Sequence, residues 1–213
     1  NSPGGNTIAA AEHAIALLLA SSRHVAHAHA STIAGGWDRK KYVGNELYKK
    51  ILGVVGLGKI GSHVAKVAIA MGMEVIAFDP FISAERAQQM QVKLSSLKDL
   101  FEKSDYVTLH LPRTQETENL VDSDLLASMK PSARLVNCAR GGIIDESALA
   151  DAITSGVIAG AALDVFASEP LSNNSPLLSV NERLILTPHL GASTAEAQEN
   201  VAIDVAEQIR DIL

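Results

Sequence analysis

The chain has 213 residues, of which 47% are apolar and 20% are charged, a composition that suits a globular domain with a sizeable buried core. The formal net charge is −6 and the basic residues form no long block, which argues against binding to nucleic acid or to an anionic membrane. The one cysteine, Cys138, has no partner for a disulfide within the chain, so we expect a reducing compartment, the cytoplasm or an organelle entered with a transit peptide.

The N-terminal part of the chain is predicted to form a long helix followed by an extended arm. The helix is expected to have Thr7 as its N-cap and to reach about Ala30, because this segment is rich in Ala and Leu and contains neither Gly nor Pro. Residues 31–50 are polar, basic and interrupted by glycines, which is typical of an exposed arm. An apolar helix beside such an arm would expose a large apolar patch, so residues 8–48 are a predicted surface for a homodimer or a larger homo-oligomer.

Three histidines lie on the predicted helix, at His24, His27 and His29. Only the first two share a face, at a spacing of three residues. We therefore expect no metal site here, and solvated or interfacial histidines instead.

From residue 51 onward, short apolar segments alternate with helical patterns. Strands are predicted at residues 51–55, 74–78, 106–110, 134–137, 161–165 and 184–186. Helices are predicted at residues 62–71, 83–90, 97–102, 122–129 and 146–155, and a last one from about Ser193, with Ser193 or Thr194 as its cap. Strands that are apolar throughout and separated by helices form parallel sheets covered on both faces. The predicted fold class is therefore α/β, a single Rossmann-type domain with a doubly wound parallel sheet.

A glycine-rich loop, GLGKIG at residues 56–61, follows the first predicted strand and precedes a helix. In this context Gly56 allows a tight turn, Gly58 lets a pyrophosphate approach the backbone, and Gly61 lets the helix pack closely on the strand. The free N–H groups at the start of the helix can bind the phosphates. The loop therefore predicts a dinucleotide site, and the alternative is a glycine turn that binds no nucleotide.

The second predicted strand ends at Asp79, 18 residues after the last glycine of the loop. A carboxylate in this place can accept hydrogen bonds from the ribose hydroxyls of adenosine and would repel a 2′-phosphate. No arginine follows it directly, since the next residues are Pro80, Phe81 and Ile82. Asp79 therefore favours NAD over NADP, and its alternative roles are a helix cap or a surface carboxylate.

Three segments at the predicted carboxyl ends of later strands carry candidate catalytic groups: NCARGG at 137–142, LDVF and SEP between 163 and 170, and TPHLGAS at 187–193. His189 can accept a hydroxyl proton while hydride leaves the carbon, and Glu169 can orient its imidazole and stabilise the protonated form. Arg140 can bind the carboxylate of a 2-hydroxy acid. Taken singly, the three could be a helix C-cap, a surface acid and an ordinary loop histidine.

These motifs resemble the D-isomer-specific 2-hydroxy acid dehydrogenases. The resemblance rests on GLGKIG, NCARGGIIDE, GAALDVF, SEP and TPHLGAS, and it spans nearly the whole chain. In that family an arginine, a glutamate and a histidine are catalytic, and they fall on Arg140, Glu169 and His189. The segment WDRKKYVGNEL at residues 37–47 narrows the resemblance to members that oxidise 3-phospho-D-glycerate with NAD, the first step of serine synthesis.

The resemblance also implies cofactor contacts that spacing alone does not predict. The backbone of Lys59 and Ile60 would lie on the pyrophosphate, Leu111 beside the adenosine, and Asp164 at the nicotinamide carboxamide. Further contacts would line the nicotinamide side or close the site: Cys138, Ala139, Arg140, His189, Leu190, Gly191 and Ala192. Leu111 stands where relatives often have a threonine, so no side-chain hydrogen bond is expected there, and Cys138 is expected to be a packed residue without reactivity.

In this family the substrate domain is built from segments on both sides of the cofactor domain. We therefore expect residues 1–213 to be the NAD-binding domain alone, able to bind NAD but nearly inactive. The basic arm residues Arg39, Lys40 and Lys41 are either solvated or lend a cation to the substrate phosphate of a second subunit. The alternatives are the same chemistry on glycerate, glyoxylate or lactate, or an NAD-sensing corepressor or scaffold. A formate dehydrogenase is disfavoured, because those enzymes have a glutamine where Glu169 stands.

Overall fold

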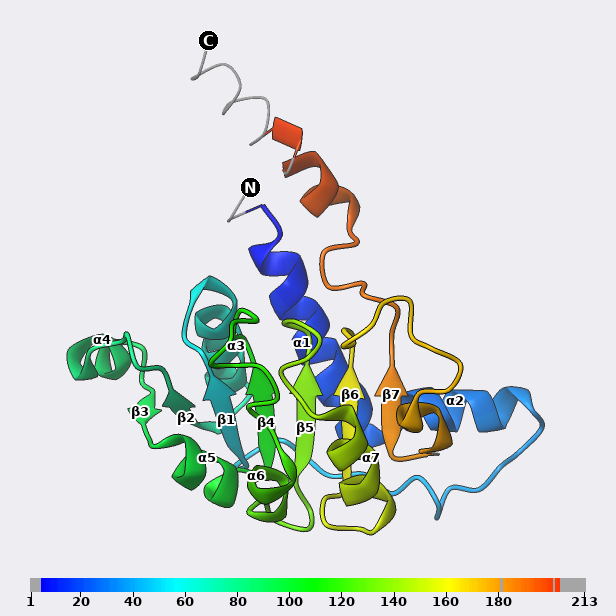
Figure 1. The fold of residues 1–213 in the computed structure, drawn as a ribbon. Coiled ribbons are helices and arrows are strands. Elements are labelled where there is room, and N and C mark those ends of the chain that lie inside the picture. Colours follow the sequence, from blue (N-terminus) through cyan, green and yellow to red (C-terminus); the bar gives the residue numbers. More distant parts are fainter. Residues whose placement is uncertain (1–4, 181, 201, 204–213) are drawn as a thin grey trace.

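The computed structural model describes residues 5–180, 182–200 and 202–203 and is built around a parallel sheet with helices on both faces (Figure 1). The strands are β1 (Ile51–Val55), β2 (Glu74–Phe78), β3 (Lys93–Leu94), β4 (Tyr106–Leu109), β5 (Arg134–Asn137), β6 (Gly160–Leu163) and β7 (Leu184–Leu186). Their spatial order is β3-β2-β1-β4-β5-β6-β7, and each neighbouring pair is parallel. The predicted fold class is confirmed, and the strand order reverses between β1 and β4, where doubly wound sheets bind ligands.

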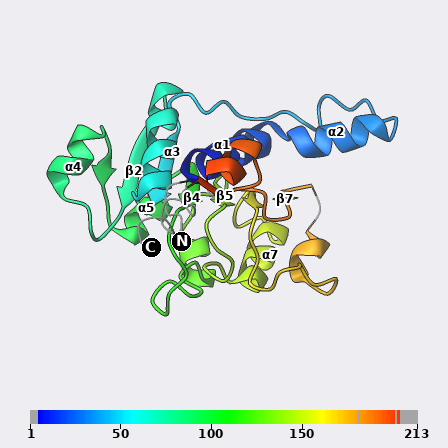
Figure 2. The ribbon, with the colours of Figure 1, turned by 90° about the horizontal axis from the view of Figure 1, so that it is seen from above.

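The helices divide between the two faces of the sheet (Figure 2). They are α1 (Thr7–Arg23), α2 (Val25–Ile33), α3 (Lys59–Ala70), α4 (Ala84–Gln89), α5 (Leu97–Lys103), α6 (Ser123–Ala127), α7 (Glu146–Thr154) and the 3-10 helix η1 (Pro176–Ser179). α1 and α3 cover one face, and α5, α6 and α7 cover the other. Two successive residues of β5 show that both faces of the sheet are buried: Leu135 belongs to the core under α5–α7, and Val136 to the core under α1 and α3.

The prediction of one unbroken helix from Thr7 to Ala30 is wrong. His24 has φ 54° and ψ 30°, and this left-handed residue ends α1 and precedes α2. Two buried serines weaken the last turn, because the hydroxyls of Ser21 and Ser22 donate to the carbonyls three residues earlier. The N-cap prediction is wrong as well: Thr7 is the first residue of α1, and Asn6 takes the cap position without a side-chain hydrogen bond.

The break at His24 turns the second half of the predicted helix away from the sheet. α2 extends beyond the body of the domain (Figures 1 and 2) and has no buried residue. The arm that follows returns along the domain toward β1. The N-terminal part of the chain thus consists of a buried helix, an exposed helix and an arm, whereas a single helix and an arm were predicted.

The other differences from the predicted elements are small. The helix after the glycine loop begins at Lys59, three residues earlier than expected, so half of the GLGKIG motif is helical. The short edge strand β3 and the helix η1 were not predicted.

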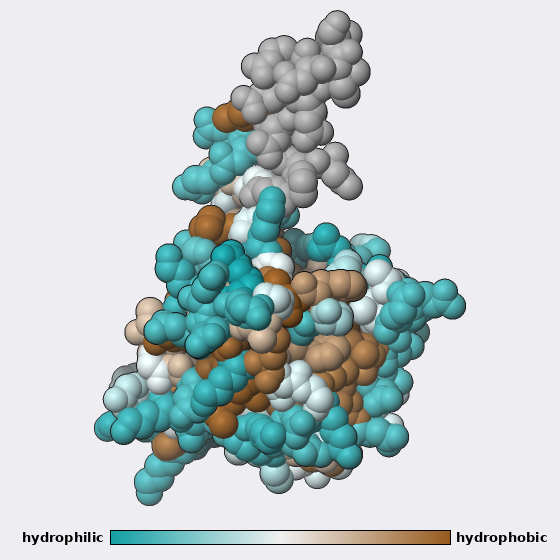
Figure 3. Space-filling view, turned by 90° about the vertical axis from the view of Figure 1, so that its left-hand side faces the viewer, coloured by the Kyte–Doolittle hydropathy of each residue, from teal (hydrophilic) through white to brown (hydrophobic). Residues whose placement is uncertain are grey.

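The face on the β3 side mixes polar residues with apolar ones gathered near its middle (Figure 3). An edge strand of only two exposed residues offers little backbone for pairing with another chain.

The last predicted helix lies only partly within the described residues. Residues 195–200 are helical, and Thr194 caps them by accepting a hydrogen bond from the Ala197 N–H at 3.0 Å. The predicted continuation of this helix beyond residue 200 falls largely on residues 201 and 204–213, which lie outside the described residues. Across the described ranges, no helix combines the length and the hydropathy needed to cross a bilayer.

Candidate active site

The glycine loop connects β1 to α3 at the carboxyl edge of the sheet. Gly56 has a positive φ of 96°, a conformation that favours glycine. A Cβ on Gly61 would lie 1.9 Å from the Gly56 carbonyl oxygen, so this position has no room for a side chain. A Cβ on Gly58, in contrast, would meet no atom within 4 Å. The open space above Gly58, at the start of α3, fits the pyrophosphate of a dinucleotide.

Asp79 follows β2 and contacts the glycine loop through its carboxylate. One oxygen accepts a hydrogen bond from the Leu57 N–H at 2.7 Å, and the other accepts from the Phe81 N–H at 2.9 Å. The carboxylate therefore has a structural role at the loop, which is neither the helix cap nor the surface carboxylate considered as alternatives. Each oxygen retains a lone pair that can accept from a ribose hydroxyl, so the predicted cofactor role is compatible with this geometry.

Arg140 lies on a turn after β5 that Asn137 holds in place. The Asn137 side chain accepts from the Ala139 N–H and donates to the Arg140 carbonyl, both at 3.0 Å. A Cβ on Gly141 would lie 1.7 Å from the Phe166 carbonyl oxygen, so the turn packs directly on the next loop. Arg140 is exposed, and its guanidinium donates one hydrogen bond to the Ala139 carbonyl at 2.5 Å, which leaves other N–H groups for a carboxylate ligand.

Glu169 and His189 form a hydrogen-bonded pair, with 2.6 Å between Glu169 Oε2 and His189 Nδ1. The other oxygen of Glu169 accepts from the Phe166 N–H at 3.0 Å. Desolvation alone would raise the pKa of Glu169, but the hydrogen bonds from His189 and Phe166 outweigh it and hold that pKa below its usual value. With Nδ1 bonded to a carboxylate, the imidazole has Nε2 available for proton transfer.

Asp164 is fully buried beneath the loop that carries His189. Its carboxylate accepts hydrogen bonds from the Thr187 hydroxyl at 2.5 Å and from the backbone N–H groups of Leu190 and Gly191 at 2.8 Å each. The implied contact with a carboxamide would have to use the lone pairs that these donors leave free. Its evident function in the fold is to fix the conformation of residues 187–191.

A cavity of about 460 Å³ brings together half of the predicted site residues. It is lined by Asn6, Ala10, Ile60, His110, Leu111, Pro112, Cys138, Ala139, Arg140, His189, Gly191 and Ala192. Glu169 is bonded to His189 but does not line the cavity, and neither do Lys59, Asp79, Asp164 or the glycines at 56, 58 and 61. Leu190 is exposed.

Two titratable residues of this cavity are neutral for reasons of burial. Desolvation raises the pKa of the Cys138 thiol far above its usual range, with a further contribution from Asp164. This agrees with the expectation that Cys138 is packed and unreactive. Burial lowers the pKa of His110 to about 4. His110 was not singled out from the sequence, because nothing in its spacing distinguishes it from an ordinary residue at the end of a strand.

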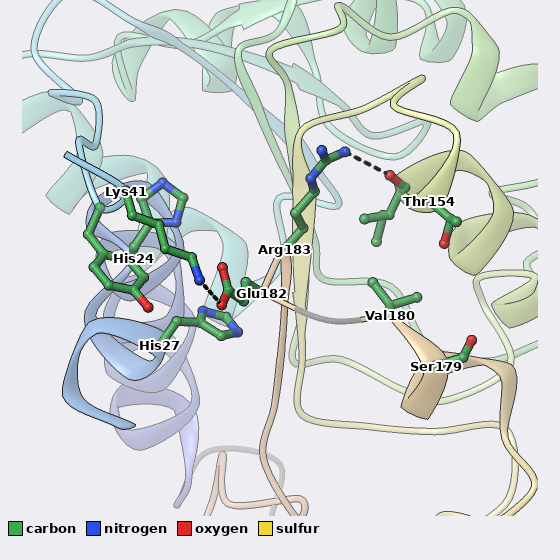
Figure 4. Close-up of a pocket in the computed structure, with 10 residues that line it drawn as sticks. His24, His27, Lys41, Thr154, Ser179, Val180, Glu182 and Arg183 are labelled. Carbon is green, nitrogen blue, oxygen red and sulfur yellow. Dashed lines mark hydrogen bonds and ion pairs between the residues drawn. The ribbon is translucent and has the colours of Figure 1, made fainter. Parts of the chain in front are cut away.

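A larger cavity, of about 680 Å³, contains none of the predicted cofactor or catalytic residues (Figure 4). It lies between α2 with the arm on one side and the start of β7, η1 and the end of α7 on the other. Lys41 of the arm forms an ion pair with Glu182 across it, and His27 contacts the Leu184 carbonyl at 3.1 Å. In the described part of the chain, no three His, Cys, Asp or Glu side chains are placed to hold a metal ion.

The chain is similar to known dehydrogenases along its length. The family model described as D-isomer specific 2-hydroxyacid dehydrogenase, NAD binding domain, matches residues 15–191. A D-3-phosphoglycerate dehydrogenase from Synechocystis sp. is 61% identical over 213 residues, which are 100% of this chain and 38% of that protein. The chain therefore spans well under half the length of this curated relative.

Solved structures show the same fold with different substrates. A glyoxylate reductase from Paecilomyes thermophila superposes with a TM-score of 0.90 at 33% identity, covering 98% of this chain and 62% of that one. A D-lactate dehydrogenase from Aquifex aeolicus, complexed with NAD and lactic acid, superposes with a TM-score of 0.89 at 26% identity, covering 99% and 67%. The fold is thus shared by enzymes that act on several small hydroxy or keto acids.

Proposed function

The chain belongs to the D-isomer specific 2-hydroxyacid dehydrogenase family, and on that premise we propose that it is the NAD-binding domain of an enzyme that oxidises 3-phospho-D-glycerate to 3-phosphohydroxypyruvate. The observation that carries the proposal is the Glu169–His189 pair, at 2.6 Å, with His189 and Arg140 on the wall of one cavity. An acid–base pair beside a cation suits the removal of hydride and a proton from a hydroxy acid.

In this proposal His189 is the base. Its Nδ1 donates to Glu169, so Nε2 accepts the proton of the substrate hydroxyl. The Glu169 carboxylate then balances the positive charge that develops on the imidazole. Arg140 holds the substrate carboxylate and orients the carbon that loses hydride. NAD, when bound, supplies the carbon atom that accepts the hydride.

The residues available for NAD follow the predicted set. The pyrophosphate would lie over Gly58 and the start of α3, and the adenosine ribose would hydrogen-bond to Asp79. Leu111, Cys138 and Ala139 supply apolar surface for the rings. Because a 2′-phosphate would meet the carboxylate of Asp79, NAD is the preferred cofactor over NADP.

The choice of substrate rests on the relatives. The 61% identity to a D-3-phosphoglycerate dehydrogenase favours 3-phospho-D-glycerate, and with it the entry to serine synthesis. Because a glyoxylate reductase and a D-lactate dehydrogenase have the same fold, glyoxylate and lactate are the alternative substrates. The wall that would select among them belongs to a substrate domain that we propose lies outside residues 1–213. An NAD-sensing corepressor or scaffold is the alternative from another class of protein.

We also propose a homodimer, or a larger homo-oligomer, formed through residues 8–48 in a cytoplasmic or organellar enzyme. α2 has no buried residue, and three large apolar side chains near it are mostly exposed: Ile33 (74%), Trp37 (81%) and Val43 (74%). A second subunit that packs on α2 and the arm would cover this surface. Lys41 of the arm is paired with Glu182 of its own subunit, so Arg39 and Lys40 are the basic residues that we propose reach the partner's site.

Binding and activity measurements test the proposed function. NADH and NADPH are titrated into the domain by fluorescence, and we expect at least a tenfold preference for NADH. The complete protein is then assayed with 3-phospho-D-glycerate, glycerate, lactate and glyoxylate. The highest kcat/KM is expected for 3-phospho-D-glycerate, with almost no turnover by the 213-residue domain. Tight NADH binding by a complete protein that oxidises or reduces none of these acids would favour the corepressor.

A further inference from the structure

His13 is a polar residue on the buried face of α1. Its neighbours on that face, Ala10, Ala14 and Leu17, are buried against the sheet, while the His13 side chain is 20% exposed. Its Nε2 atom lies 3.1 Å from Asp164 Oδ1 and 3.2 Å from the Thr187 hydroxyl. This mostly buried polar group therefore has two hydrogen-bonding partners, both more than 150 residues away in the chain.

The hydrogen bonds around Asp164 determine the role of this imidazole. The carboxylate is fully buried, so its charge needs several donors. The Thr187 hydroxyl gives its one proton to Asp164, at 2.5 Å, and can therefore only accept from His13. The His13 Nε2 atom must then carry a proton, which it shares between the hydroxyl and the carboxylate.

The partners of His13 hold the loop that carries His189. We call residues 187–191 the His189 loop. Asp164 binds this loop at three points, through Thr187, Leu190 and Gly191. His189 itself has φ 56°, a left-handed conformation that is unfavourable for a residue other than glycine and has to be imposed by its surroundings. The side chain of His189 has its one recorded hydrogen bond, within the described residues, to Glu169.

We propose that His13 is a positioning residue for the reaction: from the rigid helix α1 it fixes Thr187 and Asp164, and through them the place of His189 at the cofactor cavity. The inference rests on the proposed function, because it assigns His13 a part in hydride transfer. Since His13 touches neither the substrate carbon nor the base directly, its loss displaces the base without removing any reacting group. A shift of one ångström in a catalytic group is enough to slow a reaction about 100-fold.

The test uses three variants of the complete protein. His13→Ala removes the donor. His13→Gln keeps one, because a glutamine amide nitrogen can take the place of the imidazole Nε2. Glu102→Gln changes an exposed residue of α5, outside both the candidate site and the proposed interface of residues 8–48, and is the control. Each variant is assayed for kcat, KM and NADH affinity, and hydrogen–deuterium exchange is followed by mass spectrometry in a peptide that covers the His189 loop.

For His13→Ala we expect kcat to fall at least tenfold, with KM and NADH affinity within threefold of wild type. Exchange in the His189 loop should become at least tenfold faster. His13→Gln should restore both quantities to within threefold, and Glu102→Gln should leave both unchanged. A residue with only a packing role would instead lower the melting temperature without this pattern, and glutamine would not rescue it.

Two results would overturn the inference. Unchanged kcat in His13→Ala would show that the reaction does not depend on this contact. Lower kcat with unchanged exchange in the His189 loop would show that His13 does not act by positioning it. A wild-type protein that turns over no hydroxy acid would refute the proposed function instead, and the exchange data would still decide whether His13 holds the loop.

Discussion

The carboxylate of Glu169 matters to this site through its charge as much as through its geometry. A glutamine could still accept the hydrogen bond from His189, but it could not balance a protonated imidazole. We predict that Glu169→Gln lowers kcat for hydroxy acid oxidation by roughly 10²-fold, while NADH affinity stays within threefold. Steady-state kinetics of the complete protein measure this, with Glu102→Gln, on the exposed side of α5, as the control. An unchanged kcat would remove Glu169 from the mechanism.

His110 gives the domain a specific dependence of stability on pH. Its pKa is about 4 in the folded protein and about 6.5 in an unfolded chain, so below pH 6.5 the unfolded state binds a proton that the folded state does not. The stabilisation is therefore fully present above pH 6.5 and is lost as the pH falls toward 4. When the pH is lowered from 7.5 to 5.0, the contribution of His110 should decrease the free energy of unfolding by roughly 2 kcal/mol. Urea denaturation at both pH values should show a smaller loss for His110→Asn than for wild type.

At the scale of elements, Gly58 and Gly61 of the GLGKIG motif are glycine for different reasons. Gly61 is required by the fold, since a Cβ there would lie 1.9 Å from the Gly56 oxygen, whereas Gly58 has free space around it. We predict that Gly61→Ala lowers the melting temperature by about 5 °C or more and weakens NADH binding. Gly58→Ala should leave the melting temperature within about 2 °C and weaken NADH binding at least tenfold. Equal melting-temperature losses in the two variants would contradict this assignment.

The elements that the sequence predicts well are those with a local signal. The six longer strands are short segments rich in apolar residues, and Gly56, Gly58 and Asp79 have the spacing of a dinucleotide loop. The break at His24 has no such signal, because it depends on one residue adopting positive φ where α1 leaves the sheet. β3 was missed because two exposed residues are too few for a pattern.

The site shows the same division. Arg140, Glu169 and His189 could be proposed from their chemistry and from their places after strands. The contacts of Asp164 with the His189 loop could not, because they depend on how two loops pack. His13 carries only a weak signal, a polar residue within the apolar face of a helix. Its partners are remote in the chain, so only the fold could identify them.

At the scale of the whole molecule, α2 and the arm are the part that the domain alone does not explain. Trp37 is 81% exposed on an arm that packs little against the body. We predict that Trp37→Glu shifts the complete protein toward monomers in sedimentation velocity, because a buried charge at a subunit interface is unfavourable. Phe81→Ser, which replaces an exposed aromatic near the other end of the sheet, should leave the oligomer intact. A monomeric wild-type protein would contradict the proposed interface.

The reversal of strand order between β1 and β4 has a thermodynamic consequence. A dinucleotide over this point would touch the β1–β2 half through Gly58 and Asp79, and the β4–β7 half through Leu111 and Ala139. It would bind only when both halves are folded, and so act as a reversible cross-link between them. By mass action, NADH at 100 times its dissociation constant should add about 2.7 kcal/mol to the free energy of unfolding. Urea titrations with and without NADH should show this gain as a single cooperative transition at higher denaturant concentration.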